Sequence, residues 1–334
     1  MKPETLQGLV RDIFVAAGMA HENAEIIAEV LVWADMRGMG SHGVMRVPRY
    51  VGWIRSGELN PRPKITAQAE TAACVLLDAD RAAGPVAMVY ATRAAMAKAK
   101  DTGVGLALVR TTTHTAALGY YTQLAAQEDF AAIAVAASGP NMAYHGARAA
   151  GVSTAPLSIA VPGNEAPLAL DMGSGIVSVG KLMQARRRGE PIEPGLALDG
   201  QGEPTTDAKR AAIPLPLGGA KGSGLALMIE CLTSLLCRAP ILAPTLENID
   251  RKHRQNGMVI AIDIAQFGDS QDYRKEVARL ARDLKALPAE PGVEILVPGE
   301  RGQRNAEAAR EHIELPPTVL AELKETAKSL GVAA

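Results

Sequence analysis

The sequence predicts an α/β protein, with a layered α/β domain and helical segments at both ends of the chain. From about residue 73 onward, apolar runs typical of strands alternate with longer runs typical of helices. Residues 4–36 have the periodicity of two amphipathic helices, and the C-terminal segment is also helical. The 334 residues are enough for a large core and two structural lobes.

The composition is that of a globular protein, with 48% hydrophobic and 21% charged residues. A net charge of -1 gives no overall attraction to nucleic acid or to a membrane surface. No apolar run reaches the roughly 18 residues that a membrane helix needs, and the amphipathic start of the chain differs from a signal peptide. We therefore expect a soluble, cytoplasmic protein with neither nucleic acid nor a membrane as partner.

Cys74, Cys231 and Cys237 lie in apolar stretches without metal-ligand spacing. This pattern predicts buried, reduced thiols rather than a disulfide, which is typical of an intracellular protein. No pair of histidines or cysteines has the i, i+3 or i, i+4 spacing of a local metal site, so we expect no metal.

The first elements are two helices, followed by a glycine-containing turn. The stretch "RGMGSHGVMR" (37–46) has the G-x-G-x-x-G spacing of a dinucleotide-binding turn. Such a turn connects a strand to a helix, whereas here a helix comes first, so we interpret the match as accidental. Ser41 is the expected N-cap of a helix through "HGVMRVPRYVGWIRSG", which Pro48 would kink, and "ELNPRPKI" is an expected linker.

The α/β part follows. Strands are predicted at 73–80, 103–110, 130–138, 166–173 and 257–267, and one that enters a loop at 292–302. Helices are predicted at 85–103, 115–129, a segment that ends at Arg188, 225–237 and 270–287. Two proline- and glycine-rich hinges are expected at 190–195 and 213–224.

One group of residues could perform chemistry at the start of the predicted helix. His42 is followed by Arg46 and Arg49, four and seven residues on, so these side chains would share one helix face. An arginine can hold a carboxylate in a bidentate pair, and an imidazole one turn away can exchange a proton with a neighbouring oxygen. A helix N-terminus favours the neutral imidazole and would lower the pKa of His42. This spacing suits a small 2-oxo or 2-hydroxy acid; the alternative is a capping segment with surface arginines.

Other candidates carry weaker signals. His114 and His145 follow predicted strands, where α/β sheets collect ligands, although a structural polar residue fits such a position about as well. The stretch "LGGAKGSGLAL" could bring Lys221 close to a phosphate, or could be a tight turn before a buried helix. Asp171 in "LDMGSG" suits a ligand-facing loop and a helix cap equally, and Arg301 in "PGER" lies at an expected loop tip.

Taken together, these segments resemble the malate/L-lactate dehydrogenase family of the type that lacks a Rossmann fold. The resemblance is carried, over nearly the whole chain, by "ADMRGMGSHGVMRVPRY", "TTTHTAALGYY", "LALDMGSG", "DGQGEPTTD", "PLGGAKGSGLAL" and "VPGER". It implies a non-Rossmann NAD(P)-binding layered α/β domain plus a mainly helical domain built from both chain ends. Residues 1–72 would form a helical substrate and dimerisation domain and 73–212 the NAD(P)-binding domain. Residues 213–334 would return to the first domain with the C-terminal strands and helices.

The resemblance also implies an enzyme that transfers a hydride between NAD or NADP and a small 2-hydroxy or 2-oxo acid, of malate, lactate, ureidoglycolate or sulfolactate type. It implies a homodimer with its active sites near the subunit contact. His42 and His114 would act in proton transfer, and Ser41 and Arg46 would bind the substrate. The residues that would contact the cofactor are Ser138, Asp171, Met172, Gly173, Ser174, Lys221, Gly299, Glu300 and Arg301.

One position departs from the family pattern. Where relatives commonly have G-T-N-P, this chain has "STAP" at 153–156, so Ala155 replaces an asparagine. Specificity would change if that amide touches the substrate or cofactor. This departure favours one alternative, a nucleotide-binding protein without catalysis. A second alternative stays within the family: an NADPH-dependent reductase of cyclic 2-imino acids. The choice between NAD and NADP stays open as well.

Overall fold

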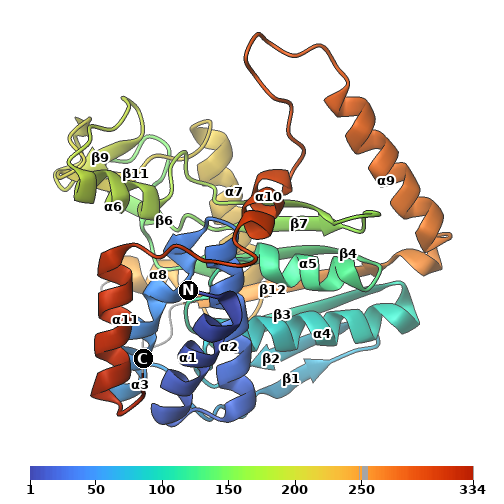
Figure 1. The fold of residues 1–334 in the computed structure, drawn as a ribbon, viewed down its shortest axis with the longest axis horizontal. Coiled ribbons are helices and arrows are strands. Elements are labelled where there is room, and N and C mark those ends of the chain that lie inside the picture. The colour runs from blue at the N-terminus through green and yellow to red at the C-terminus, as the bar shows by residue number, and fades with distance from the viewer. Residues whose placement is uncertain (248, 250–254, 334) are drawn as a thin grey trace.

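A seven-stranded mixed sheet forms the centre of the protein (Figure 1). The structure, a computed structural model, describes residues 1–247, 249 and 255–333. The strand order is β1 (Thr66–Glu70), β2 (Cys74–Asp78), β3 (Val104–Thr112), β12 (Gln255–Asp263), β4 (Phe130–Ser138), β7 (Leu157–Val161) and β8 (Leu168–Met172). The β2–β3 pair is parallel and the other five pairs are antiparallel. The predicted α/β class is thus confirmed, and the sheet differs from the parallel sheet of a Rossmann fold.

The remaining elements surround this sheet. The helices before β12 are α1 (Pro3–Ala16), α2 (His21–Met36), α3 (Val47–Ser56), α4 (Gly84–Thr102), α5 (Gly119–Gln127), α6 (Val179–Arg188), α7 (Ala220–Glu230) and α8 (Leu242–Leu246). Those after it are α9 (Ser270–Lys285), α10 (Glu300–Ala308) and α11 (Pro317–Ser329). Short helical turns are η1 (Gly40–His42), η2 (Val44–Arg46), the π-helical η3 (Cys231–Leu235) and η4 (Ile264–Gln266). Two small sheets combine β9 (Ala197–Asp199) with β10 (Pro204–Thr205) and β11 (Ala211–Pro214), and β5 (Met142–Ala143) with β6 (Ala150–Val152).

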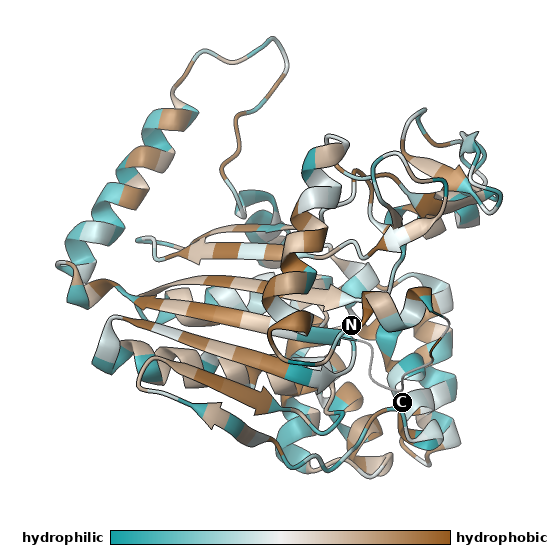
Figure 2. Ribbon diagram, turned by 180° about the vertical axis from the view of Figure 1, so that it is seen from behind, coloured by the Kyte–Doolittle hydropathy of each residue, from teal (hydrophilic) through white to brown (hydrophobic). Residues whose placement is uncertain are grey.

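Side-chain alternation divides the core between the two faces of the sheet. On one face, Ala107 and Val259 belong to a large apolar cluster that includes α4 and α5. On the other face, Leu108 and Met258 pack in a second cluster with α7 and α8. Figure 2 shows the sheet from this second side, with α7 in front of the strands.

The helices at the two ends of the chain pack together. Val319, Leu323 and Ala327 of α11 are buried in the cluster that contains the apolar faces of α1, α2 and α3. The terminal ammonium of Met1 donates to the backbone oxygen of Ile313 at 2.9 Å, which ties the N-terminus to the segment before α11. Both predicted N-terminal helices and the helical C-terminus are confirmed.

The expected helix from Ser41 is wrong at its start. Residues 40–46 form the two turns η1 and η2, and the α-helix begins at Val47 without a side-chain cap. Pro48 lies in the first turn of α3, where its missing N–H costs nothing, so it starts the helix instead of kinking it.

The strand expected at 292–302 is also wrong. Among the described residues, 293–297 have no strand partner, and one backbone hydrogen bond, from Ala169 N to Pro298 O at 3.2 Å, joins the end of the segment to β8. The expected linker "ELNPRPKI" contains no strand, but strand β1 follows it directly. The sequence predicts neither β1 nor β7, and it does not predict the short strands β5, β6, β9, β10 and β11. The apolar helix at 225–237 is present as α7 continued by η3.

The prediction of three buried thiols holds for one of them. Cys237 is buried and Cys231 half-buried, whereas Cys74 is exposed, and all three are free. Cys74 lies on the same face of β2 as Leu76, two residues on. Leu76 is itself only partly buried, so this face is incompletely covered at the start of the strand. In the described part of the chain, no helix has both the length and the apolar character needed to cross a membrane.

Candidate functional site

Two histidines that lie 72 residues apart in the sequence meet in space. His42 ends the turn η1, and His114 follows strand β3. Their rings are stacked, with centroids 5.7 Å apart and planes inclined by 19°. The hydroxyl of Ser41 lies 3.0 Å from Nδ1 of His42, and this hydrogen bond orients the imidazole ring. The arrangement brings together the two histidines that the family resemblance implies for proton transfer.

Arg46 lies beside this pair. Its Nε donates to the backbone oxygen of Ser41 at 2.6 Å, which orients the guanidinium and leaves its two terminal nitrogens for another acceptor. Among the described residues, no acidic side chain lies within ion-pair distance of Arg46 or Arg49. A half-buried guanidinium without an acidic partner is suited to bind a carboxylate.

Both imidazoles are neutral at physiological pH. Burial, together with the positive charge of Arg46, lowers the pKa of His42 to about 4. Burial also lowers the pKa of His114 well below its usual value, and the charges of Arg46, His42 and Arg49 act in the same direction. A neutral imidazole has one free ring nitrogen that can accept a proton.

Tyr50 is a site residue that the sequence analysis missed. Its side chain is fully buried, and its Oη lies 2.7 Å from Nδ1 of His114 and 3.1 Å from the backbone oxygen of His114. The backbone oxygen can only accept, so Tyr50 satisfies both contacts by donating to it and accepting from Nδ1–H. Nε2 is then the proton-accepting nitrogen of His114. The i+4 spacing from Arg46 to Tyr50 was the available signal in the sequence.

The backbone around His114 is held from several directions. Thr111 has a φ of +61°, which is an outlier for a β-branched residue. The N–H of Thr115 donates to Gln255 Oε1 at 2.9 Å, and the hydroxyl of Tyr121 donates to the Thr115 oxygen at 2.6 Å. A Cβ on Gly84, at the start of α4, would lie 2.1 Å from the His114 oxygen. This segment therefore presents His114 from a rigid, tightly packed support.

The glycines of "RGMGSHGVMR" serve packing. Asp35 of α2 accepts from the N–H of Val44 at 2.7 Å, and a Cβ on Gly43 would lie 2.1 Å from Asp35 Oδ1. Burial raises the pKa of Asp35 to about 7. This close contact between a buried carboxyl and a glycine explains the spacing without a phosphate.

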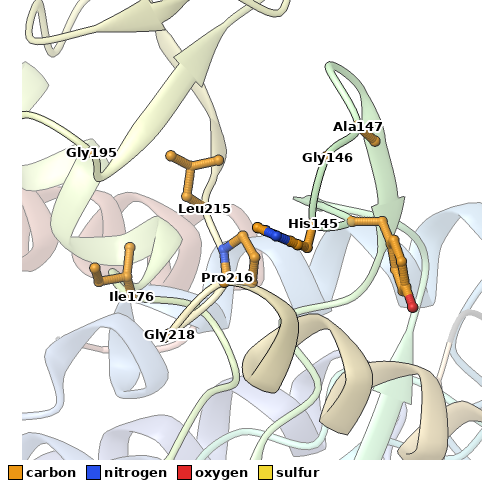
Figure 3. Close-up of a pocket in the computed structure, with 10 residues that line it drawn as sticks. His145, Gly146, Ala147, Ile176, Gly195, Leu215, Pro216 and Gly218 are labelled. Atoms are coloured by element: carbon orange, nitrogen blue, oxygen red, sulfur yellow. The ribbon is translucent and has the colours of Figure 1, made fainter.

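A separate pocket of about 290 Å³ lies near the start of α7 (Figure 3). Its lining includes His145, Ile176 and Pro216, with Gly218 and Gly219 from the predicted hinge. Both glycines have positive φ, and the His145 ring is directed toward Pro216. The structure thus places His145 in a pocket lining, apart from the stacked histidines.

Ser174 and Lys221 lie at the same glycine-rich turn. The backbone oxygen of Ser174 accepts from the N–H of Leu217 at 2.9 Å, and the Lys221 N–H donates to the Gly218 oxygen at 3.3 Å. The Ser174 hydroxyl is buried and has no hydrogen-bond partner in the described part of the chain. Such a group is normally satisfied, so it points to a missing neighbour.

The other predicted cofactor residues occupy different surroundings. Asp171 accepts from Gly119 N at 2.8 Å, the bond expected of a helix cap for α5, and burial raises its pKa to about 6. Met172 ends β8, Gly173 follows it, and Ser138 Oγ lies 3.4 Å from the Gly139 oxygen.

The "PGER" residues lie at the start of α10. Gly299 caps this helix with a φ of +89° and packs against Ala169 of β8. Glu300 pairs with Lys285 at 2.5 Å and with Arg304 at 2.6 Å, and these bonds lower its pKa to about 2. Arg301 is exposed. None of these three residues is among those that line the pocket of Figure 3.

The segment that lines the pocket also lies against Ser41, the neighbour of His42. A Cβ on Gly180, in the first turn of α6, would lie 2.6 Å from Cβ of Ser41. Ile176, which precedes α6, and Gly195, which follows it, both line the pocket. Gly180, which the sequence analysis did not single out, thus lets the segment that follows β8 lie directly against Ser41.

Ala155 is fully buried in the apolar cluster that contains Met142 and Val152. The alanine that replaces the usual asparagine therefore packs in the core. Among the described residues, no cluster of three or more His, Cys, Asp or Glu residues could hold a metal ion.

Comparisons with known proteins identify the family of this chain. Residues 1–324 match the family described as malate/L-lactate dehydrogenase. L-sulfolactate dehydrogenase of Methanocaldococcus jannaschii is 33% identical over 99% of this chain and 97% of its own length. A solved structure of sulfolactate dehydrogenase from that organism has a TM-score of 0.89, over 99% of this chain and 97% of the other.

Two further relatives are named for other substrates. Ureidoglycolate dehydrogenase (NAD(+)) of Escherichia coli K12 is 34% identical over 93% of this chain and 91% of its own. The structure of delta1-piperideine-2-carboxylate reductase from Pseudomonas syringae has a TM-score of 0.87 and 26% identity, covering 98% of this chain and 99% of that one. On this match of sequence and fold along the whole chain, the protein belongs to the malate/L-lactate dehydrogenase family.

Proposed function

We propose that this protein is an NAD(P)-dependent oxidoreductase of small 2-hydroxy and 2-oxo acids. The observation that carries the proposal is Arg46, which has no acidic partner among the described residues and lies beside the stacked His42 and His114. Relatives named for malate, sulfolactate and ureidoglycolate share this class of substrate. The family is enzymatic, which leaves the alternative of a non-catalytic binding protein without support.

Four side chains bind the substrate or transfer its proton in this proposal. Arg46 binds the substrate carboxylate through its terminal nitrogens, while Ser41 holds the Arg46 side chain and the His42 ring. In oxidation, neutral His42 accepts the proton of the 2-hydroxyl group, and in reduction it returns that proton to the carbonyl oxygen. His114, oriented by Tyr50, is the second proton-transfer residue. When bound, the nicotinamide accepts or supplies the hydride.

The glycine-rich turn fits a nucleotide. The N-terminus of α7 and the side chain of Lys221 favour an anion there, and the Ser174 hydroxyl offers an unused hydrogen-bonding group. We propose these as cofactor contacts, together with Ser138, Asp171, Met172, Gly173, Gly299, Glu300 and Arg301. The cofactor is NAD or NADP.

A second candidate is the reduction of cyclic 2-imino acids. With its pKa lowered to about 4, His42 is almost entirely neutral near pH 7, so few molecules hold a proton on it for donation. A protonated imine already carries the proton that a ketone must receive, so it needs less help from an acid. The fold match with delta1-piperideine-2-carboxylate reductase supports this alternative.

We further propose that the enzyme is a cytoplasmic homodimer. The three free thiols agree with a reducing compartment. The domain division at residues 72 and 212 stays a prediction; residues 255–263 form β12 and pair with β3 and β4 of the central segment.

The test follows the absorbance of the reduced nicotinamide. Purified protein is mixed with NADH or NADPH and a panel of 2-oxo acids and one cyclic imine; ureidoglycolate is run with NAD or NADP in the oxidative direction. Turnover of a 2-oxo or 2-hydroxy acid supports the proposal, and turnover of the imine alone supports the second candidate. Cofactor binding without turnover of any compound would contradict both.

A further inference from the structure

Two consecutive side chains of strand β12 hold the segment that carries His114. In the sheet, β12 lies between β3 and β4 (Figure 1). Gln255 Oε1 accepts from the N–H of Thr115 at 2.9 Å, and Asn256 Oδ1 accepts from the N–H of Thr111 at 3.0 Å. His114 therefore lies between two backbone groups that are fixed by neighbouring residues of one strand.

The ladder between β3 and β12 contains a β-bulge at this place. The pairing register shifts by one residue at Asn256, so two residues of β3, 110–111, lie opposite this one residue of β12. A bulge disrupts the regular ladder and bends the longer strand, and bulges are frequent beside active sites, where they redirect a side chain. The N–H of Thr111 donates to the side chain of Asn256 in place of a backbone oxygen of the neighbouring strand.

Thr111 has a backbone conformation that its side chain disfavours. Its φ of +61° lies in the left-handed region, which glycine adopts freely and a β-branched residue rarely adopts. Such a conformation persists only where the surrounding structure holds it. The Thr111 oxygen accepts from the N–H of Arg81 at 2.8 Å, and the Thr111 N–H donates to Asn256, so both sides of the residue are held. Loss of the Asn256 contact would let Thr111 relax toward negative φ and turn the chain that follows it.

The side chain of Asn256 is itself fixed. It is fully buried, and its Nδ2 donates to the backbone oxygen of Ala239 at 2.8 Å and to Ser234 Oγ at 3.0 Å. A backbone N–H can only donate and a backbone oxygen can only accept, so the amide has one orientation. Both N–H groups and the oxygen of this amide have a partner, which makes Asn256 a rigid support.

We propose that Asn256 and Gln255 are positioning residues that set the direction of the His114 ring through the bulge. A turn of this ring would lengthen the 2.7 Å contact of its Nδ1 with Tyr50 Oη and disturb its stacking on His42. Both side chains act through the backbone on either side of the histidine. The inference rests on the proton-transfer role proposed above for His114 and names the residues that hold it in place.

The ring nitrogens of His114 can be observed without any substrate. Nitrogen-15 NMR of protein with labelled histidines distinguishes the two neutral tautomers, and His114→Gln identifies the signals that belong to this ring. In the wild type we expect the tautomer with the proton on Nδ1, which the contact with Tyr50 requires. Gln255→Met keeps the side-chain length and removes the oxygen that accepts from Thr115, so we expect the His114 signals to shift or to divide between two tautomers.

Asn256→Ala removes the acceptor for the Thr111 N–H. Ser234→Ala is its matched control, because it removes a different bond of the same amide and leaves that acceptor in place. We expect Asn256→Ala to shift the His114 signals and to lower kcat for the 2-oxo acid about tenfold or more, with KM for the cofactor unchanged. Ser234→Ala should lower the urea midpoint of unfolding but leave the His114 signals and kcat at their wild-type values.

Thr111→Gly supplies a rescue. Glycine adopts positive φ without strain, so Thr111→Gly combined with Asn256→Ala should keep the bulge, restore the His114 signals and recover most of the lost kcat. A double variant that gains stability without moving the His114 signals would overturn the proposal.

Unchanged His114 signals in both Gln255→Met and Asn256→Ala would also contradict the proposal, as would a Ser234→Ala variant that loses as much kcat as Asn256→Ala. If Asn256→Ala does not fold, Gln255→Met decides: shifted His114 signals support the proposal and unchanged signals overturn it. Because the NMR spectrum needs no substrate, a failure of the proposed activity is distinct from a failure of these residues to position His114.

Discussion

Tyr50 Oη lies 2.7 Å from Nδ1 of His114, which gives this buried tyrosine control over which nitrogen of His114 carries the proton. Tyr50→Phe removes the hydroxyl and keeps the ring. We expect turnover to fall about tenfold, the equivalent of one lost hydrogen bond of ~1.4 kcal/mol, with cofactor binding unchanged. Tyr120→Phe, which removes a hydrogen bond to Glu29, is the control. Equal rates for Tyr50→Phe and the wild type would show that this contact does not act in proton transfer.

His42→Ala removes the residue proposed to exchange the substrate proton. We expect turnover of a 2-hydroxy acid to fall by roughly 10²-fold or more, because a positioned acid/base group typically contributes that much. Binding of NADH, followed by its fluorescence, should be retained. His114→Ala measured in parallel shows which ring dominates. With a cyclic imine as substrate, a smaller loss for His42→Ala would favour the second candidate function.

Arg46→Lys keeps the positive charge but loses the planar fork that binds a carboxylate through two nitrogens. We expect kcat/KM for the 2-oxo acid to fall roughly 10- to 100-fold, the equivalent of ~1.5–3 kcal/mol for charged hydrogen bonds. Arg49→Lys is the matched control, since the Arg49 guanidinium lies over the Trp53 ring, 4.7 Å from its centroid. A larger loss in the control would assign the carboxylate to Arg49 instead.

Asp35→Asn tests the buried carboxyl beneath the histidine loop. The pKa of Asp35 is raised from 3.8 to about 7, so between these values the folded chain holds a proton that the unfolded chain has released. The free energy of unfolding that this group contributes is therefore present at low pH and lost as the pH rises toward 7.

The asparagine has no such titration. We expect Asp35→Asn to match the wild type near pH 4 and to be more stable than it at pH 8, as measured by urea unfolding at both values. The comparison between the two proteins cancels the other titrating groups. A constant difference in stability across this range would mean that Asp35 ionises normally in the folded protein.

Gly43→Ala tests the reason for the glycine spacing in the histidine loop. The added Cβ would meet Asp35 Oδ1 at 2.1 Å, so we expect a loss of ~1–3 kcal/mol in the free energy of unfolding. Gly52→Ala, inside α3 with open space around the Cβ, should instead stabilise the protein by roughly 0.5–1 kcal/mol. Urea unfolding of both variants checks this, and a harmless Gly43→Ala would remove Asp35 as the cause of the spacing.

The family and most of the longer helices and strands could be predicted from the amino-acid sequence alone. Periodicity identified α1, α2, α4, α5 and α9, because the apolar face of a helix repeats every three to four residues whatever it packs against. The ordered blocks over nearly the whole chain pointed to the family that the comparisons then confirmed. The sequence also singled out His42, His114 and Arg46 within distinctive short motifs, and their roles stay a prediction.

Contacts between residues far apart in the sequence could not be predicted in this way. A strand needs a partner with free backbone groups, so β12 could be placed between β3 and β4 only in three dimensions, and the apolar run at 293–297 found no ladder. The stacking of His42 on His114, the bond from Tyr50 and the fit of Gly43 against Asp35 are contacts between separate elements. Periodicity records which way a side chain points along its own helix or strand, whereas its neighbours across the core depend on how those elements pack.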